Sequence, residues 1–96
     1  MDLKEYQEII SRTYLSRDQN RGIYKTLIWL VEEVGELARA VRNGQGLEEE
    51  FADVLAWLLS VANLAGIDVD SAMDRYRDGC PKCKKQPCEC PVDKWT

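Results

Sequence analysis

The chain has 96 residues, enough for one small domain that buries only about 60–65% of its unfolded surface by itself. Its net charge of −4 and pI near 4.8 argue against a nucleic acid polymer as a partner. The polar segment Met1–Glu5 lacks the pattern of a signal peptide, and the apolar run Val54–Ala65 is too short to span a bilayer. We therefore expect a soluble, cytoplasmic protein with no membrane partner, in which an oligomer or a metal ion adds stability.

The sequence contains no histidine. This excludes nucleophilic sites of the Ser-His and Cys-His kinds and zinc sites built on imidazole. It also argues against di-iron helical bundles, which use a Glu-x-x-His pair from two of their helices. Metal sites built on carboxylates remain, and such hard oxygen ligands favour Mg²⁺ or Mn²⁺.

The hydrophobic pattern predicts an all-α protein with four helices, at about residues 2–18, 23–42, 47–65 and 69–78. Asp2 is a suitable N-cap for the first helix, and the polar segment from Arg17 to Gly22 predicts a loop or break after it. The glycines within Arg42–Gly46 predict a tight turn between the second and third helices, because glycine accepts the positive φ that ends a helix. Gly66 is the expected end of the third helix, and Asp68 or Asp70 caps the short fourth one.

The second predicted helix is apolar on two sides, and the third is apolar nearly all round after Asp53. A helix with two apolar sides needs two burial partners, which favours a homodimer. The third helix is expected to be the most buried element. On the second helix, the stripe directed toward the core comprises Leu27, Val31, Val34, Ala38 and Val41, and the other stripe comprises Ile23, Leu30 and Leu37.

The tail, residues 80–96, differs from the predicted helical domain, residues 1–79. Its cysteines and prolines indicate a compact loop, and in a cytoplasmic protein four thiolates are more typical of a structural zinc knuckle than of two disulfides. The C-x-C half is unusual for zinc, so ligands shared between subunits or partial oxidation remain open. A redox role is a weaker alternative, because no thioredoxin-like context surrounds the C-x-x-C. The four cysteines are Cys80, Cys83, Cys88 and Cys90.

Two acidic motifs lie in the second and third predicted helices. Each holds two carboxylates three residues apart, a spacing that places both on one helix face about 5 Å apart. Residues 33 and 53 are equally far from residue 43, as are residues 36 and 50, so a chain that reverses there brings all four to one level. Such a cluster repels itself unless a cation lies within it. The carboxylates are Glu33 with Glu36 and Glu50 with Asp53.

The alternative is a solvated helix face, which is the usual role of surface glutamates. These acids, however, lie in the two most apolar helices, and most lack a basic partner one turn away. Trp29 and Trp57 are also equidistant from residue 43, so both indoles are expected beside the acids, where they would suit a ligand with a flat ring and a polyphosphate. Taken singly, each tryptophan is better explained by core packing. Lys25 lies on the same face of the second predicted helix as Trp29 and Glu33, and it is either a phosphate contact or an ordinary exposed lysine.

The pattern Glu32-Glu33-x-x-Glu36 followed by Glu50-x-x-Asp53, with its surrounding sequence, resembles the MazG-like, all-α nucleoside triphosphate pyrophosphohydrolases over roughly residues 20–78. The resemblance implies a dimer or dimer of dimers with sites near the interface. It also implies that Glu32 orients water and that nucleotide and phosphate contacts come from Lys25, Trp29, Arg75 and Arg77, beside Trp57. The Mg²⁺ ligands implied are Glu33, Glu36, Glu50 and Asp53.

The predicted function is therefore Mg²⁺-dependent hydrolysis of a nucleoside triphosphate between the α and β phosphates, which releases a monophosphate and pyrophosphate. Glu32 or Glu50 is the preferred base for the attacking water. One alternative is a non-catalytic helical dimer that binds Mg²⁺ or nucleotide as a sensor or partner module. Another is an interaction adaptor built on the zinc-binding tail. The sequence selects no base or sugar of the nucleotide and no physiological pathway.

Overall fold

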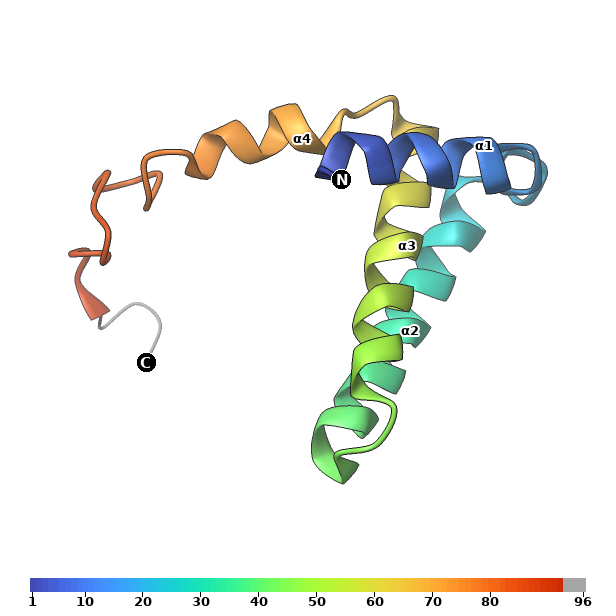
Figure 1. Ribbon diagram of the computed structural model, residues 1–96, viewed down its shortest axis with the longest axis horizontal. Coiled ribbons are helices and arrows are strands. Elements are labelled where there is room, and N and C mark those ends of the chain that lie inside the picture. The colour runs from blue at the N-terminus through green and yellow to red at the C-terminus, as the bar shows by residue number, and fades with distance from the viewer. Residues whose placement is uncertain (93–96) are drawn as a thin grey trace.

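The computed structural model describes residues 1–92, and within that range the protein is helical and contains no strand (Figure 1). This confirms the predicted all-α class. Three long helices form the body: α1 (Leu3–Arg21), α2 (Ile23–Asn43) and α3 (Leu47–Ala65). A single turn, α4 (Val69–Ala72), continues directly into the 3-10 helix η1 (Met73–Tyr76).

α1 begins at the predicted cap but ends later than predicted. The Asp2 carboxylate accepts a hydrogen bond from the Glu5 amide at 2.8 Å, and the Glu5 side chain accepts one from the Asp2 amide at 3.4 Å. The predicted loop from Arg17 to Gly22 is wrong, because the helix continues to Arg21 and only Gly22, at φ 90°, interrupts it. The polar side chains of this last turn bond to one another within the fold, which polarity alone does not indicate.

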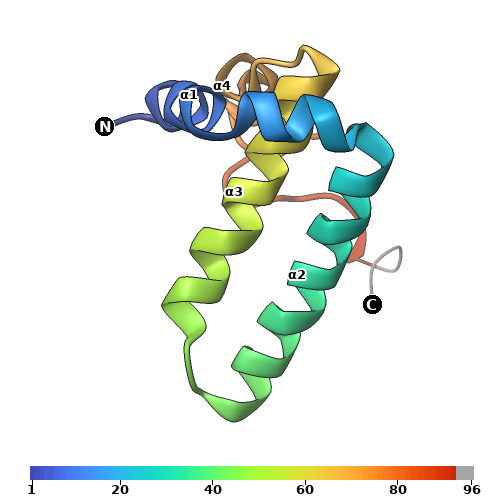
Figure 2. The same cartoon turned by 90° about the vertical axis from the view of Figure 1, so that its right-hand side faces the viewer.

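α2 and α3 form an antiparallel hairpin (Figure 2). Gly44 and Gly46 both adopt the left-handed conformation, with φ of 70° and 64°, and the Gly44 amide donates to the Ala40 carbonyl at 2.7 Å. The turn therefore has the expected position and chemistry. Gly66 ends α3 in the same way, with its amide directed at the carbonyls of Ala62 and Asn63.

α1 crosses the open end of the hairpin and packs on α3 (Figures 1 and 2). Gln7, which is 8% exposed, holds α1 in this position through hydrogen bonds in which it acts both as donor and as acceptor. Its amide nitrogen donates to Asn63 Oδ1 at 3.0 Å and to the Ile67 carbonyl at 2.7 Å, and its amide oxygen accepts from the Val69 amide at 2.9 Å. One side chain of α1 thus holds the end of α3 and the start of α4 in place.

The core of the single chain is small, and one of the two stripes on α2 lies outside it. Ile23, Leu30 and Leu37 are half-buried, and the buried apolar residues are Ala40, Leu59 and Ala62. The prediction that the other stripe faces the core of the chain is wrong: its large side chains are 44–63% exposed. α3 contains more fully buried residues than α1 or α2, yet it too has an uncovered face. The exposed large side chains of this stripe and this face include Leu27, Val31, Val34 and Val41 on α2 and Phe51, Leu55 and Leu58 on α3.

The fourth helix is shorter than the predicted 69–78. Asp68 caps it, accepting from the amides of Asp70 and Ser71, but regular α-helix ends at Ala72 and residues 70–78 are exposed. Few packing contacts therefore support a longer helix. Within residues 1–92, no single helix is long and apolar enough to cross a membrane; α3 together with the segment Val69–Tyr76 would reach that length, but the two are bent by 98°.

Candidate active site

The hairpin brings three of the predicted acids together. Glu33 from α2 and Glu50 and Asp53 from α3 each offer a carboxylate oxygen, and these oxygens all lie within 4.8 Å of one another. Their convergence follows from the sequence, since the turn at Gly44–Gly46 reverses the chain midway between the two acidic motifs. We call these three residues the acidic cluster.

Two observations indicate that the acidic cluster fits a cation. Glu50 Oε2 is buried and has no hydrogen-bond partner among residues 1–92, a costly state for a carboxylate oxygen unless a cation binds it. The pKa of Glu33 is raised, first by partial burial and then by the negative charges of Glu50, Asp53 and Glu36. The donor set consists of carboxylates alone, which suits Mg²⁺ or Mn²⁺.

Glu36 and Glu32 lie beside the acidic cluster but outside it. Glu36 is one turn beyond Glu33 on α2, and its Oε2 pairs with Arg39 Nη1 at 3.5 Å on an exposed surface. Sequence spacing predicted Glu36 among the converging carboxylates, and the structure instead pairs it with Arg39, which relieves repulsion between acids. Glu32 is exposed and forms no ion pair within residues 1–92.

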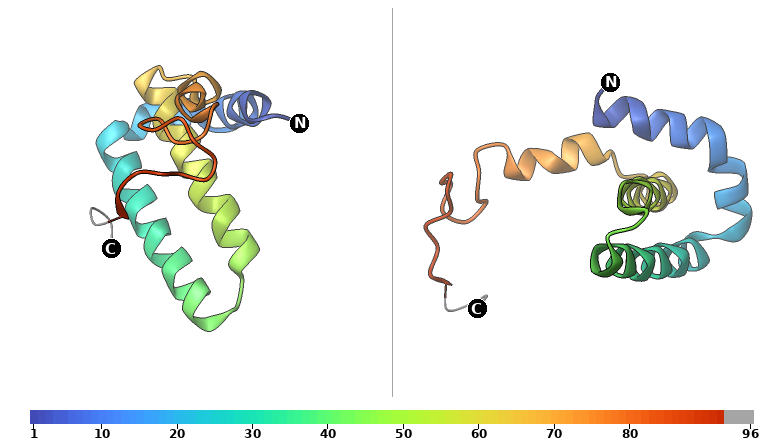
Figure 3. Two further views of the ribbon diagram at one scale, coloured as in Figure 1. Left: turned by 90° about the vertical axis from the view of Figure 1, so that its left-hand side faces the viewer. Right: turned by 60° about the horizontal axis from the view of Figure 1, so that its bottom comes forward.

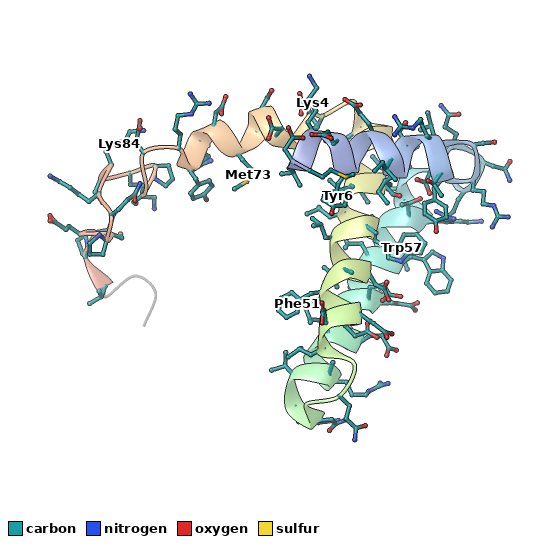
Figure 4. All side chains as sticks on the ribbon, viewed as in Figure 1. Lys4, Tyr6, Phe51, Trp57, Met73 and Lys84 are labelled. Carbon is teal, nitrogen blue, oxygen red and sulfur yellow. The ribbon has the colours of Figure 1, made fainter. Side chains whose placement is uncertain are left out.

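The two tryptophans meet across the hairpin as their spacing predicts. The ring centroids of Trp29 and Trp57 are 6.1 Å apart and the planes are inclined by 20°, so the indoles stack. Trp57 and Phe51, both on α3, point to opposite sides of the hairpin in Figure 4. The stacked pair therefore lies on the side away from the exposed apolar face of α3.

A cleft of about 290 Å³ extends from Asp53 along α3 to the C-terminal half of α1. Asp53 belongs to the acidic cluster and also lines this cleft, so a ligand in the cleft reaches the carboxylates. The walls combine aromatic rings with guanidinium groups. They are formed by Tyr14, Arg17, Asp18, Arg21, Asp53, Ala56, Trp57 and Ser60.

Arg21 connects all three long helices at the cleft. Its Nη1 donates to Asp18 Oδ1 at 2.9 Å and to Thr26 Oγ1 at 3.3 Å, and its guanidinium carbon lies 5.0 Å from the centroid of the Trp57 ring. Asp18 is 2% exposed, and its second oxygen, Oδ2, is buried without a hydrogen-bond partner in the described part of the chain. Thr26 is fully buried, and its hydroxyl donates to the Gly22 carbonyl at 2.8 Å.

Sequence reasoning missed the contribution of α1 to the cleft. Tyr14, Arg17 and Arg21 are spaced three and four residues apart, so they share one stripe of a helix that continues to residue 21. The predicted loop concealed this pattern, because the first predicted helix ended at residue 18 and left Arg21 outside it.

Other predicted contacts lie elsewhere in the chain. Lys25 is exposed on α2. Arg75 is on η1, where its guanidinium carbon lies 5.8 Å from the Tyr76 ring centroid, and Arg77 Nη2 pairs with Asp74 Oδ1 at 2.7 Å. η1 projects from the body on the side opposite to Trp57, so the structure does not bring these two arginines to the acidic cluster within one chain (Figures 1 and 4).

The four cysteines form a separate group in the tail. Their sulfur atoms all lie within 4.8 Å of one another, and all four are free thiols. Figure 3 shows this segment on an arm that leaves the helical body beyond α4.

A family model described as the MazG nucleotide pyrophosphohydrolase domain matches residues 21–85. The matched range contains the whole hairpin, the acidic cluster and both tryptophans of the stacked pair. It begins at Arg21, so Tyr14, Arg17 and Asp18 of the cleft precede it. A search of curated proteins found none that matches the chain.

Proposed function

The chain belongs to the MazG nucleotide pyrophosphohydrolase family, and from that premise we propose that it hydrolyses ribo- or deoxyribonucleoside triphosphates to monophosphate and pyrophosphate. The observation that carries this proposal is the acidic cluster at the edge of a cleft lined by arginines and aromatic rings. We place the activity in the cytoplasm, as a reaction that clears unwanted nucleotides from the pool.

We propose Glu33, Glu50 and Asp53 as ligands of Mg²⁺ or Mn²⁺, with Glu36 joining them by leaving Arg39. The unpartnered Glu50 oxygen and the raised pKa of Glu33 support a cation at this position. When bound, Mg²⁺ neutralises phosphate oxygens and makes water more acidic. The chain itself supplies the rigid helices that hold these carboxylates and the cleft that orients the substrate.

The cleft matches the two ends of a nucleotide. Arg17 and Arg21 carry positive charge near Asp53 and suit the triphosphate, whereas Trp57 and Tyr14 place aromatic rings in the lining of the cleft, where the base would lie. Trp29 supports Trp57 by stacking on it. Lys25 and Arg75 remain proposed substrate contacts; Arg75 would reach a site only on another subunit.

A carboxylate must accept the proton of the attacking water. Glu32 is the first candidate because it neighbours Glu33, is exposed and forms no ion pair within residues 1–92. Glu50 is the second, through its unpartnered oxygen. Attack in line on the α-phosphorus by a water so placed would expel pyrophosphate, with Arg17 and Arg21 beside the developing charge.

We propose a homodimer or a dimer of dimers as the working form. The exposed stripe on α2 and the apolar face of α3 leave more large side chains uncovered than the single chain buries. A second hairpin laid on this surface would complete a four-helix core, which accounts for a helix that is apolar on two sides.

The test is incubation of the full chain with Mg²⁺ and each common triphosphate, followed by chromatographic identification of the products. Monophosphate and pyrophosphate in equal amounts are expected from at least one substrate. Diphosphate with inorganic phosphate would contradict the proposed bond cleavage. Tight nucleotide binding without turnover would instead support a Mg²⁺- and nucleotide-binding sensor module.

A further inference from the structure

The cysteine tail has the construction of a metal site. Residues 80–92 contain almost no apolar side chain that could form a core, and Val92 is 73% exposed. The four sulfur atoms nevertheless converge to within 4.8 Å. A segment this short and polar needs a cross-link to hold such a conformation, and a bound metal supplies one.

We propose that Cys80, Cys83, Cys88 and Cys90 of a single chain bind one structural zinc ion, separate from the metal of the acidic cluster. In a tetrahedral zinc site with Zn–S bonds of about 2.3 Å, neighbouring sulfurs are about 3.8 Å apart. The structure gives 3.6 Å between the sulfurs of Cys80 and Cys90, and 3.9 Å between those of Cys83 and Cys88. All four ligands come from one chain, so no sharing between subunits is required.

The backbone around the sulfurs supports this site independently. The amide of Glu89 donates to Cys83 Sγ at 3.3 Å, and the amide of Cys90 donates to Cys88 Sγ at the same distance. Such bonds stabilise the negative charge of a thiolate, the form in which cysteine binds metal. The turn itself is closed by the Lys84 amide, which donates to the Cys80 carbonyl at 2.7 Å.

The turn requires glycine at position 79. It has a φ of 101°, and a methyl group at its Cα would lie 2.7 Å from the Lys85 carbonyl oxygen. The Lys85 carbonyl also accepts the Cys80 amide at 3.2 Å. The backbone at Lys85 therefore lies directly against Gly79. A side chain at residue 79 would push this part of the loop away from the first two cysteines.

The lysines beside the sulfurs offset the charge of the proposed site. Four thiolates and one zinc ion carry a net charge of −2. Lys82, Lys84 and Lys85 lie within five residues after Cys80, and Glu89 is the one acidic residue between Cys80 and Cys90. The zinc is accordingly proposed to fold the tail, with all four positions taken by protein and none open for catalysis.

The experiment measures metal content and geometry on the full chain, purified under reducing conditions. Elemental analysis should give about one zinc per chain, and cobalt(II) exchanged into the site should show the absorption of tetrahedral thiolate coordination. Zinc should persist after dialysis against metal-free buffer, which removes Mg²⁺, and an organomercurial should release it. Iron at that stoichiometry, two disulfides, or four free thiols that take up no cobalt would each overturn the proposal.

Variants localise the metal. Cys83→Ala should lower the zinc content at least tenfold, and Gly79→Ala should weaken binding without removing any ligand. Glu89→Gln is the matched control, because it keeps the amide that faces Cys83 and should leave the zinc content unchanged. Mg²⁺-dependent pyrophosphate release measured on the same proteins separates this proposal from the proposed activity. Full zinc content in Cys83→Ala would contradict the assignment even if that activity is present.

Discussion

The guanidinium carbon of Arg21 lies 5.0 Å from the centroid of the Trp57 ring, so the last turn of α1 covers the indole that α3 directs into the cleft. The same guanidinium pairs with Asp18, a carboxylate that is 2% exposed. One residue therefore connects the stability of the fold to the shape of the proposed substrate site.

Replacement of Arg21 by methionine should destabilise the protein by about 3 kcal/mol, because it leaves the buried Asp18 carboxylate without its partner. The measurement is chemical denaturation monitored by circular dichroism. Arg12→Met is the matched control on the same helix: Arg12 reaches Glu8 only at 4.0 Å on the exposed surface, and its loss should cost less than about 1 kcal/mol. Equal effects of the two substitutions would show that the buried pair does not support the fold.

The raised pKa of Glu33 predicts a pH dependence of stability in the metal-free protein. A carboxyl that holds its proton more tightly in the folded state stabilises that state at low pH, and this stability is lost as the pH rises through the raised pKa. Glu33→Gln should therefore match the native chain near pH 4 and unfold at a higher temperature than it near pH 7, in thermal melts with chelator.

Added Mg²⁺ should remove this advantage of Glu33→Gln, because the ion stabilises the native chain more than the variant. Glu49→Gln provides the control, since Glu49 is exposed in the first turn of α3 and lies outside the acidic cluster. Its effect on the melting temperature should be the same with and without Mg²⁺. An equal response of both variants to Mg²⁺ would place the ion elsewhere.

Glu36 and Arg39 provide a test of whether the acidic cluster gains a fourth ligand. If Glu36 leaves Arg39 to bind the cation, Glu36→Gln should weaken Mg²⁺ activation at least about tenfold, whereas Arg39→Ala should leave it unchanged or strengthen it. The readout is the Mg²⁺ concentration that gives half-maximal pyrophosphate release. A loss of similar size in both variants would mean that the ion pair itself matters.

The uncovered stripe predicts an interface between chains. Val31→Glu should place a charge on this surface and shift the protein toward the monomer, as measured by sedimentation equilibrium. Met73→Glu is the control, because Met73 is 51% exposed but lies on η1, away from the hairpin. A monomeric native chain, or a Val31→Glu variant with unchanged mass, would contradict the proposed assembly.

Sequence patterns predicted the hairpin well because glycine fixes its turn. The positive φ values at Gly44, Gly46 and Gly66 define where α2 and α3 end, and equal distances from residue 43 then set which acids meet. Periodicity also identified the two apolar stripes of α2. Periodicity could not show which stripe packs inside the chain and which is left for another chain, because residue spacing identifies a helix face but not what covers that face.

The remaining differences arise from side-chain contacts that spacing does not encode. Asp18 and Arg21 extend α1 through a polar segment by bonding to each other inside the fold. Glu36 is directed to Arg39 by an ion pair one turn away, although its position on α2 is as predicted. The fourth helix is short because its side chains are exposed and have few neighbouring residues to pack against.

The central claim is that the acidic cluster holds the metal that hydrolysis requires, and Asp53→Asn tests it most directly. This substitution keeps the size of the side chain and removes one of the converging charges, while Asp70→Asn does the same at an exposed position outside the acidic cluster. With Mg²⁺ and the preferred triphosphate, pyrophosphate release should fall at least about 100-fold in Asp53→Asn and remain native in Asp70→Asn. Release by Asp53→Asn at close to the native rate, in a protein of unchanged helicity, would contradict the account.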